Sequence, residues 1–282
     1  MINTNETLKK YDLKLTKTLG QNFLTDINII RKIVDAGEVT DKDLVIEIGP
    51  GIGAMTVVLS ERAGKVVAVE IDKNLIPALK ENLAHCTNLE IIHADIMKVD
   101  IPSLVSGWDG PLKVISNLPY YITTPIVMML LESDIPFDML VFMVQKEVAQ
   151  RMAAAPSTKD YGALTIAVNY YADPKLCFTV SKNCFIPKPD VDSAVVRLKK
   201  RVHASTVEVS KQAFFRVVRS AFSMRRKTLL NSLGSQPWLS GGKEGLKAIM
   251  GEAGLPESIR AEELTLEQFV NLTRCIEKHQ SL

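Results

Sequence analysis

The sequence contains few cysteines, histidines and aromatic residues. Its 282 residues include 4 Cys and 4 His, and aromatic residues make up 6%. No two cysteines form a CxxC pair, and none stands at a metal-binding spacing from a histidine, which argues against both a disulfide framework and a zinc site. We therefore expect reduced thiols and no bound metal.

The sequence also lacks long apolar segments. No window approaches the roughly 18 uninterrupted apolar residues that a membrane helix needs, and the N-terminal MINTNETLKKYDLKLTKTLG has no apolar signal-peptide core. These absences predict a cytoplasmic protein with no membrane partner. The composition, 46% hydrophobic and 23% charged, is typical of a folded protein with one large domain and a smaller one, or with two domains.

Charge is distributed unevenly along the chain. The formal net charge is +2, but residues 1–174 carry −6 and residues 175–282 carry +8. A basic segment of this size indicates a polyanionic partner, most often nucleic acid, although a solvated basic face would explain the charge equally well.

Short β-branched runs alternate with helical patterns over the first two thirds of the chain. Strands are expected at 45–48, 66–69, 89–92, 113–116 and 139–144, with helices such as 75–82 and 124–131 between them. Several runs are apolar on both faces, as in a parallel sheet covered by helices on two sides. Strands at 175–180 and 194–198 flank the proline-rich FIPKPDVDS and are expected to finish the sheet as a hairpin. The predicted fold class is α/β, Rossmann-like, with a mostly parallel seven-stranded sheet.

Only helical patterns remain after about residue 207, at 211–232, 243–251 and 265–280. We therefore expect two domains, 1–204 and a small all-helical domain at 205–282. Apolar residues recur on one face of the helix at 211–232, while basic residues fall largely on other faces, namely Lys211, Arg216, Arg219, Arg226 and Lys227. We expect these side chains to contact nucleic-acid phosphates. One alternative is that these side chains are solvated or pair with Glu262, Glu263 and Glu267. Another is that RNA is contacted instead by Lys9, Lys10, Lys14 and Lys17.

A glycine-rich segment, VIEIGPGIGAMT at 45–56, connects the first strand to a helix. Glycines there let the backbone approach a ligand closely, which indicates a nucleotide-type cofactor site, although a tight turn is the simpler alternative. Gly49, Gly51 and Ala54 satisfy the GxGxxG/A spacing, which does not separate NAD from S-adenosylmethionine. Glu47 in the strand and Pro50 in the loop suit a cofactor without pyrophosphate.

A carboxylate stands at the end of the second expected strand and another at the end of the third. Glu70 stands 21 positions after Gly49, where a carboxylate can accept hydrogen bonds from ribose hydroxyls. Asp95 is placed to accept a hydrogen bond from the cofactor's adenine amino group, or else to cap the following helix.

The fourth strand ends in SNLPYYITTP at 116–125. The Asn117 side-chain oxygen and the Leu118 carbonyl could accept hydrogen bonds from the exocyclic amine of a base, with Pro119 orienting that carbonyl and Tyr120 stacking on the ring. A proline-terminated strand with a buried tyrosine is the alternative. The pattern favours a methyltransferase acting on a base.

The motifs together resemble the KsgA-type small-subunit ribosomal RNA adenine N6,N6-dimethyltransferases over essentially the whole chain. They occur in order as LGQNFLTD (19–26), VIEIGPGIGAMT (45–56), VVAVEID (66–72), HADIMKVD (93–100), NLPYYITTPI (117–126), QKEVAQRM (145–152), FIPKPDVDSAVVRL (185–198) and FRVVRSAFSMRRKTLLNSL (215–233). The resemblance implies a methyltransferase-type Rossmann domain, S-adenosylmethionine as cofactor, and dimethylation of two adjacent adenines near the 3′ end of 16S rRNA in a pre-30S particle. A monomer is expected.

The resemblance also assigns residue roles. The implied cofactor contacts are Gln21, Asn22, Leu24, Gly49, Gly51, Glu70, Ile71, Asp95 and Ile96, with Asn117 shared between methyl donor and acceptor. Phe185 would sandwich the target adenine opposite Tyr120, and Tyr121 occupies a variable position with no clear consequence. The alternatives are a large-subunit methylase of the macrolide-resistance type, a non-enzymatic RNA-binding relative and, more distantly, an NAD dehydrogenase.

Overall fold

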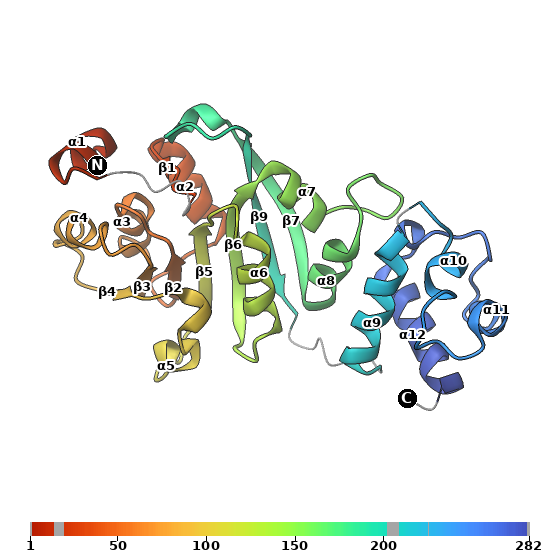
Figure 1. The fold of residues 1–282 in the computed structure, drawn as a ribbon. Coiled ribbons are helices and arrows are strands. Elements are labelled where there is room, and N and C mark those ends of the chain that lie inside the picture. The colour runs from red at the N-terminus through yellow and green to blue at the C-terminus, as the bar shows by residue number, and fades with distance from the viewer. Residues whose placement is uncertain (1, 14–19, 202–208, 225, 281–282) are drawn as a thin grey trace. The chain divides into compact units, whose positions relative to one another are not determined.

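The chain folds into two compact units. The computed structural model describes residues 2–13, 20–201, 209–224 and 226–280 (Figure 1). One unit consists of residues 1–149 and 173–200, and the other of residues 150–172 and 201–282.

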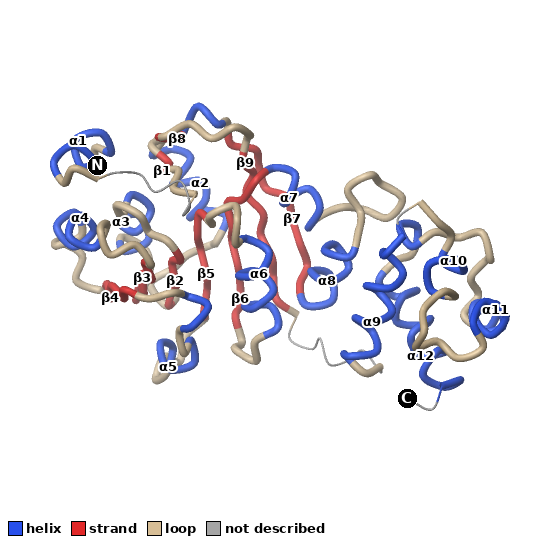
Figure 2. Tube along the Cα trace, viewed as in Figure 1, coloured by secondary structure: helices blue, strands red, loops and turns tan. Residues whose placement is uncertain are grey.

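The first unit contains a seven-stranded sheet with strands in the order β4-β3-β2-β5-β6-β9-β7 (Figure 2). The strands are β2 (Leu44–Ile48), β3 (Lys65–Glu70), β4 (Leu89–His93), β5 (Leu112–Asn117), β6 (Phe137–Gln145), β7 (Ala172–Val180) and β9 (Ser193–Lys200). Neighbours from β4 to β6 pair in parallel, and β9 pairs with β6 antiparallel. The predicted fold class and sheet are confirmed.

The strand order of this sheet reverses between β2 and β5. Chain order runs outward from β2 to β4 on one side and from β5 to β6 on the other. In open α/β sheets, ligands bind in the crevice beyond the carboxyl ends of the strands at such a switch point. The fold therefore directs attention to the ends of β2, β3 and β5.

Helices connect the strands of the first unit. They are α1 (Thr4–Lys10), α2 (Ile27–Ala36), α3 (Ala54–Ser60), α4 (Ile76–Asn82), η2 (Ile96–Lys98), α5 (Ile101–Val105), α6 (Thr123–Glu132) and α7 (Lys146–Met152), the last of which continues into the second unit. A short strand, β1 (Phe23–Leu24), pairs antiparallel with β8 (Phe185–Ile186). FIPKPDVDS therefore begins with a strand that joins the N-terminal segment.

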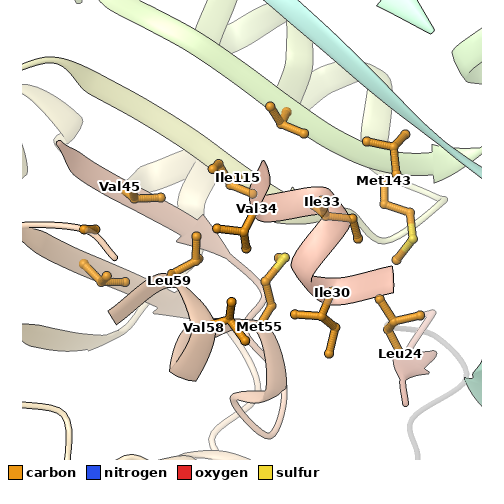
Figure 3. Packing of buried hydrophobic residues seen from close by; sticks show 14 of the residues in the cluster. Leu24, Ile30, Ile33, Val34, Val45, Met55, Val58, Leu59, Ile115 and Met143 are labelled. Carbon is orange, nitrogen blue, oxygen red and sulfur yellow. The ribbon is translucent and has the colours of Figure 1, made fainter. Parts of the chain in front are cut away.

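The core of the first unit follows from helical and strand periodicity. Ile30, Ile33 and Val34 of α2 lie three and four positions apart, so they share one helix face. They pack with Met55, Val58 and Leu59 of α3 against Val45, Ile115 and Met143 of the sheet (Figure 3). Strand residues that point the other way, such as Ile46, Val114 and Phe142, are equally buried. Both faces of the sheet are thus covered, as the apolar strands predicted.

The second unit is helical and larger than expected. It contains α8 (Ala163–Tyr171), α9 (Lys211–Ala221), η5 (Phe222–Met224), α10 (Leu229–Leu233), α11 (Gly242–Glu252), η6 (Ala261–Glu263) and α12 (Leu266–Gln280). The expected boundary at 204/205 lies near residue 200, where the chain passes from the first unit to the second. Residues 150–172 also belong to the second unit, which the sequence did not predict. The reason is that α8 packs against α9 and α12, with the rings of Tyr170 and Phe214 4.9 Å apart.

The helix expected over 211–232 is interrupted, which corrects that prediction. Helix α9 ends at Ala221, and α10 begins only at Leu229. The backbone N–H of Leu229 donates to the Ile259 carbonyl, 2.8 Å away, outside either helix. The interruption lets the chain turn so that both Leu229 and Leu233 are fully buried.

Candidate active site

A pocket of about 870 Å³, including the solvent at its mouth, lies at the carboxyl ends of β2, β3 and β5. These strands contribute Glu47, Glu70 and Asn117 to its walls. Most of the sequence-predicted site residues line it, namely Gln21, Asn22, Leu24, Gly49, Gly51, Glu70, Ile71, Asn117, Leu118, Pro119 and Tyr120. Folding thus brings together residues from across the first 121 positions.

The glycine-rich loop presents backbone to this pocket. Gly49 and Gly51 have φ angles of +67° and +63°, which favour glycine. A Cβ on Gly51 would lie 2.7 Å from the Phe23 ring, whereas no atom lies within 4 Å of the position that a Cβ on Gly49 would take. The space beside Gly49 is therefore open to a ligand.

Glu70 holds this loop in place. Its Oε2 accepts a hydrogen bond from the Gly51 N–H at 3.0 Å, and its Oε1 accepts one from the Asp72 N–H at 2.8 Å. The residue is only 4% exposed, and burial raises the pKa of its carboxyl group. Gln21 extends the arrangement, because its Nε2 donates to Asp72 Oδ2 at 2.7 Å. Glu70 therefore sets the loop geometry as well as lining the pocket.

Glu47 is the more unusual carboxyl group. It is 1% exposed, and its Oε2 accepts no hydrogen bond from any residue in the described ranges. Burial raises its pKa to about 8. An unpaired buried carboxylate is costly, so the group holds a proton near neutral pH. The sequence marks Glu47 as suited to the site, but only the fold shows this isolation.

The end of β5 presents hydrogen-bond acceptors. Asn117 Nδ2 donates to the Asn22 carbonyl at 3.1 Å, which fixes the amide and leaves Oδ1 as an acceptor. Within the described ranges, the Leu118 carbonyl also accepts no hydrogen bond. The Tyr120 hydroxyl bonds Ser193 Oγ at 2.8 Å, and burial raises the pKa of Tyr120. The tyrosine therefore stays protonated and its ring is held in position.

Three predicted residues do not line the pocket. Asp95 Oδ1 accepts a hydrogen bond from the Met97 N–H at 3.0 Å and so caps η2, which begins at Ile96. Phe185 lies opposite Leu24 in the β1–β8 pair, is 4% exposed and packs in the core cluster. Contacts of Asp95 and Ile96 with a cofactor, and of Phe185 with a target base, stay predictions.

Comparison with known proteins decides the family. The model of the ribosomal RNA adenine dimethylase family matches residues 12–278. The chain belongs to this family. It is 49% identical to the ribosomal RNA small subunit methyltransferase A of Lachnoclostridium phytofermentans, covering 98% of this chain and 96% of that protein. It is also 49% identical to the protein of the same name from Clostridioides difficile, covering 97% and 94%.

Solved structures agree with this membership in the adenine dimethylase family. A dimethyladenosine transferase from Plasmodium falciparum superposes with a TM-score of 0.77 at 26% identity, covering 89% of this chain and 95% of that one. The 23S rRNA methyltransferase ErmE superposes with a TM-score of 0.69 at 27% identity, covering 90% and 99%. The small-subunit relatives are thus nearer in sequence than the large-subunit enzyme, which weakens the macrolide-resistance alternative.

The basic residues expected to contact RNA fall into two groups in this dimethylase. Lys211 Nζ lies 5.2 Å from the centroid of the Tyr171 ring, and the Arg216 guanidinium lies 5.6 Å from that of Trp238. Arg219 on α9, and Arg226 and Lys227 in the connection before α10, are exposed. Lys14 and Lys17 lie outside the described residues. Lys211 is exposed as well, so Arg216 is the one predicted contact of these five that is partly buried.

Neither a membrane-spanning helix nor a cluster of metal ligands occurs in the described part of the chain. No helix in the described part of the chain is both long and apolar enough to cross a membrane. Within residues 2–13, 20–201, 209–224 and 226–280, no three His, Cys, Asp or Glu side chains gather as metal ligands.

Sequence reasoning missed some residues of the pocket. Phe23, Ile52 and Leu75 line it and form a separate apolar cluster, against which Ile2, Leu8 and Leu13 pack. Ser193, the partner of the Tyr120 hydroxyl, is 73 positions away in sequence. Phe23, Ile52 and Ser193 lie inside the motifs LGQNFLTD, VIEIGPGIGAMT and FIPKPDVDSAVVRL, but a motif does not show which of its side chains reach the pocket. Leu75 lies outside all the motifs.

Proposed function

We propose that this chain uses S-adenosylmethionine to dimethylate N6 of adenines in small-subunit ribosomal RNA. The observation that carries the proposal is the pair of available acceptors, Asn117 Oδ1 and the Leu118 carbonyl, beside an open glycine-rich loop. The printed names of the relatives support the small subunit as the source of the RNA. The finer proposal is two adjacent adenines near the 3′ end of 16S rRNA, modified in a cytoplasmic pre-30S particle by a monomer.

The residues of the pocket fit S-adenosylmethionine better than a dinucleotide. Glu47 Oε2 is a buried oxygen without a partner, and the ammonium group of a methionine moiety would favour loss of the Glu47 proton and pair with the resulting carboxylate. A pyrophosphate in the same place would face two buried carboxyl groups, Glu47 and Glu70. When bound, S-adenosylmethionine supplies an electrophilic methyl group.

The acceptors at the end of β5 would act on the amine of adenine. That nitrogen is a poor nucleophile because its lone pair is delocalised into the ring. Hydrogen bonds from its two N–H groups to Asn117 Oδ1 and the Leu118 carbonyl favour a pyramidal nitrogen, whose lone pair can then attack. Tyr120 holds the ring by stacking, so catalysis rests on positioning and electrostatics.

A direct test is methyl transfer from labelled S-adenosylmethionine to purified small-subunit particles that lack the modification, followed by nucleoside analysis. We expect N6,N6-dimethyladenosine, since a monomethylated amine keeps one N–H to donate to one acceptor. Large-subunit particles serve as the control and should take up no label. Monomethyladenosine alone after long incubation would contradict dimethylation, and labelling only of large-subunit particles would contradict the substrate.

A charge variant tests the RNA contact. Replacing Arg219, Arg226 and Lys227 by Gln should weaken particle binding. The slope of the logarithm of the binding constant against the logarithm of the salt concentration should become shallower by about 0.7 to 0.9 for each lost phosphate contact. The matched control replaces the exposed Lys32, Lys42 and Lys80 of the first unit by Gln, with no expected change. Binding is measured between 50 and 200 mM salt, a range over which such contacts change affinity strongly. An equal salt-dependence slope in both variants would show that these three side chains are solvated and do not contact RNA.

A further inference from the structure

Tyr121 is the most exposed large hydrophobic side chain within the described residues, at 55%. Hydrophobic stabilisation scales with the area removed from water, so this ring contributes little to the stability of the fold. Yet Tyr121 lines the same pocket as Gly49, Glu70 and Asn117. An exposed aromatic ring at the mouth of an active site is available to a ligand.

The local backbone explains why the two tyrosines differ. Residues 119–122 form a turn in which the Ile122 N–H donates to the Pro119 carbonyl at 3.3 Å, with Tyr120 and Tyr121 at its two central positions. The Tyr120 hydroxyl is tied to Ser193 of β9, which is fully buried. Tyr121 stays exposed. The turn thus directs one ring inward and leaves the next at the surface.

The Tyr121 ring lies near the backbone of Gly20. Tyr121 Cδ1 lies 3.6 Å from the position that a Cβ on Gly20 would occupy, so the ring edge lies beside this backbone. Gly20 itself lines the pocket. The aromatic side chain is therefore placed at the rim, next to the segment that carries Gln21 and Asn22.

We propose that the Tyr121 ring stacks on the base of the nucleotide next to the target adenine. This inference rests on the proposed function, in which Tyr120 stacks on the target itself. Both tyrosines line the same pocket, Tyr120 tied to buried Ser193 and Tyr121 exposed at the surface, so the two rings are available to consecutive nucleotides of one strand. Proteins that read single-stranded RNA splay its bases onto aromatic side chains, and such stacking tolerates any base.

Stacking at this position acts on RNA binding and not on the reacting atoms. Drawing the target adenine out of its own stack costs a few kcal/mol. A neighbouring base held by Tyr121 offsets part of this cost, because the strand is then already splayed at the pocket. Tyr121 is thus a positioning residue for the substrate.

The first arm of the test compares Tyr121→Ala, Tyr121→Phe and the control Leu176→Ala, in which a side chain 41% exposed on β7 is shortened. Stacking of one base is worth about 1–3 kcal/mol, so Tyr121→Ala should raise the KM for small-subunit particles about 5- to 150-fold. The kcat, the Kd for S-adenosylmethionine and the unfolding temperature should stay unchanged. Tyr121→Phe, which keeps the ring, and Leu176→Ala should both match the wild type.

The second arm removes the base instead of the side chain. Particles are reconstituted with rRNA that carries an abasic nucleotide on either the 5′ or the 3′ side of the target adenine. The wild type should lose affinity for one of the two, while Tyr121→Ala should lose nothing further on that same particle, since the stack is already absent.

Three results would overturn the inference. The first is an equal loss of affinity in the wild type and in Tyr121→Ala for both abasic particles. The second is an unchanged KM for Tyr121→Ala. The third is a change in the cofactor Kd that accounts for the whole rise in KM. Failure of the proposed function looks different, because the wild type would then transfer no methyl group to the unmodified particle.

Discussion

Replacing Asn117 by alanine should lower kcat for methyl transfer by about 10²- to 10³-fold, while the cofactor Kd changes little. The variant loses Oδ1, one of two acceptors for the N–H groups of the adenine amine. Loss of one preorganised hydrogen-bonding group from an active site costs about 2.7–4 kcal/mol of transition-state stabilisation. Single-turnover transfer to unmodified small-subunit particles measures the effect.

A second variant serves as the control for Asn117→Ala. Glu70→Ala should raise the cofactor Kd, measured by calorimetry, because it removes the carboxylate that accepts from the Gly51 N–H and orders the loop. The two variants therefore separate chemistry from cofactor binding. Near-normal single-turnover rates for Asn117→Ala would exclude the proposed role of its side-chain oxygen.

Replacing Glu47 by glutamine should stabilise the ligand-free protein at alkaline pH, by up to about 5 kcal/mol at pH 9. Burial raises the pKa of Glu47 from 4.5 to about 8 in the folded chain. Between these values the folded state holds a proton that the unfolded state has lost, so the wild type loses stability as pH rises through this window. Glutamine has no proton to lose and escapes this dependence.

Denaturant unfolding at pH 6 and at pH 9 measures this difference. At pH 6 Glu47 is already protonated in the folded state, so the variant should gain less there than at pH 9. The control is Glu61→Gln, which alters an exposed carboxylate on the same unit and should leave the pH dependence unchanged. A free energy of unfolding that falls between pH 6 and pH 9 by the same amount in wild type and Glu47→Gln would contradict a protonated Glu47.

Much of the first unit could be predicted because its signals are local. Runs such as 66–69 and 139–144 are apolar on both faces, so their type and their place in a covered sheet follow from sequence. Glycines at 49 and 51 stand between a strand and a helix, and the structure gives both a positive φ. The cluster of predicted residues around Asn117 follows from the same rule that strand ends meet at one edge of a parallel sheet.

What the sequence could not predict depends on contacts between distant residues. The interruption after Ala221 is invisible in an apolar pattern that continues through Leu229 and Leu230, because the Leu229 N–H finds its partner at Ile259. Helix α8 joins the second unit through side chains some 40 to 100 positions later. A carboxylate at the end of a strand, such as Asp95, is expected equally for a helix cap and for a ligand contact, and the structure shows only the cap.

The interleaving of the two units also affects the order in which the chain can fold during synthesis. Strand β6 ends at Gln145, but β9, its antiparallel neighbour, ends only at Lys200. At about 5–20 residues per second, β6 remains an open sheet edge for about 3–11 s, and such edges invite pairing with other chains. Helix α8 emerges in the same interval, before α9 and α12 exist to cover Tyr170 and Tyr171. A nascent-chain chaperone would find both surfaces exposed together.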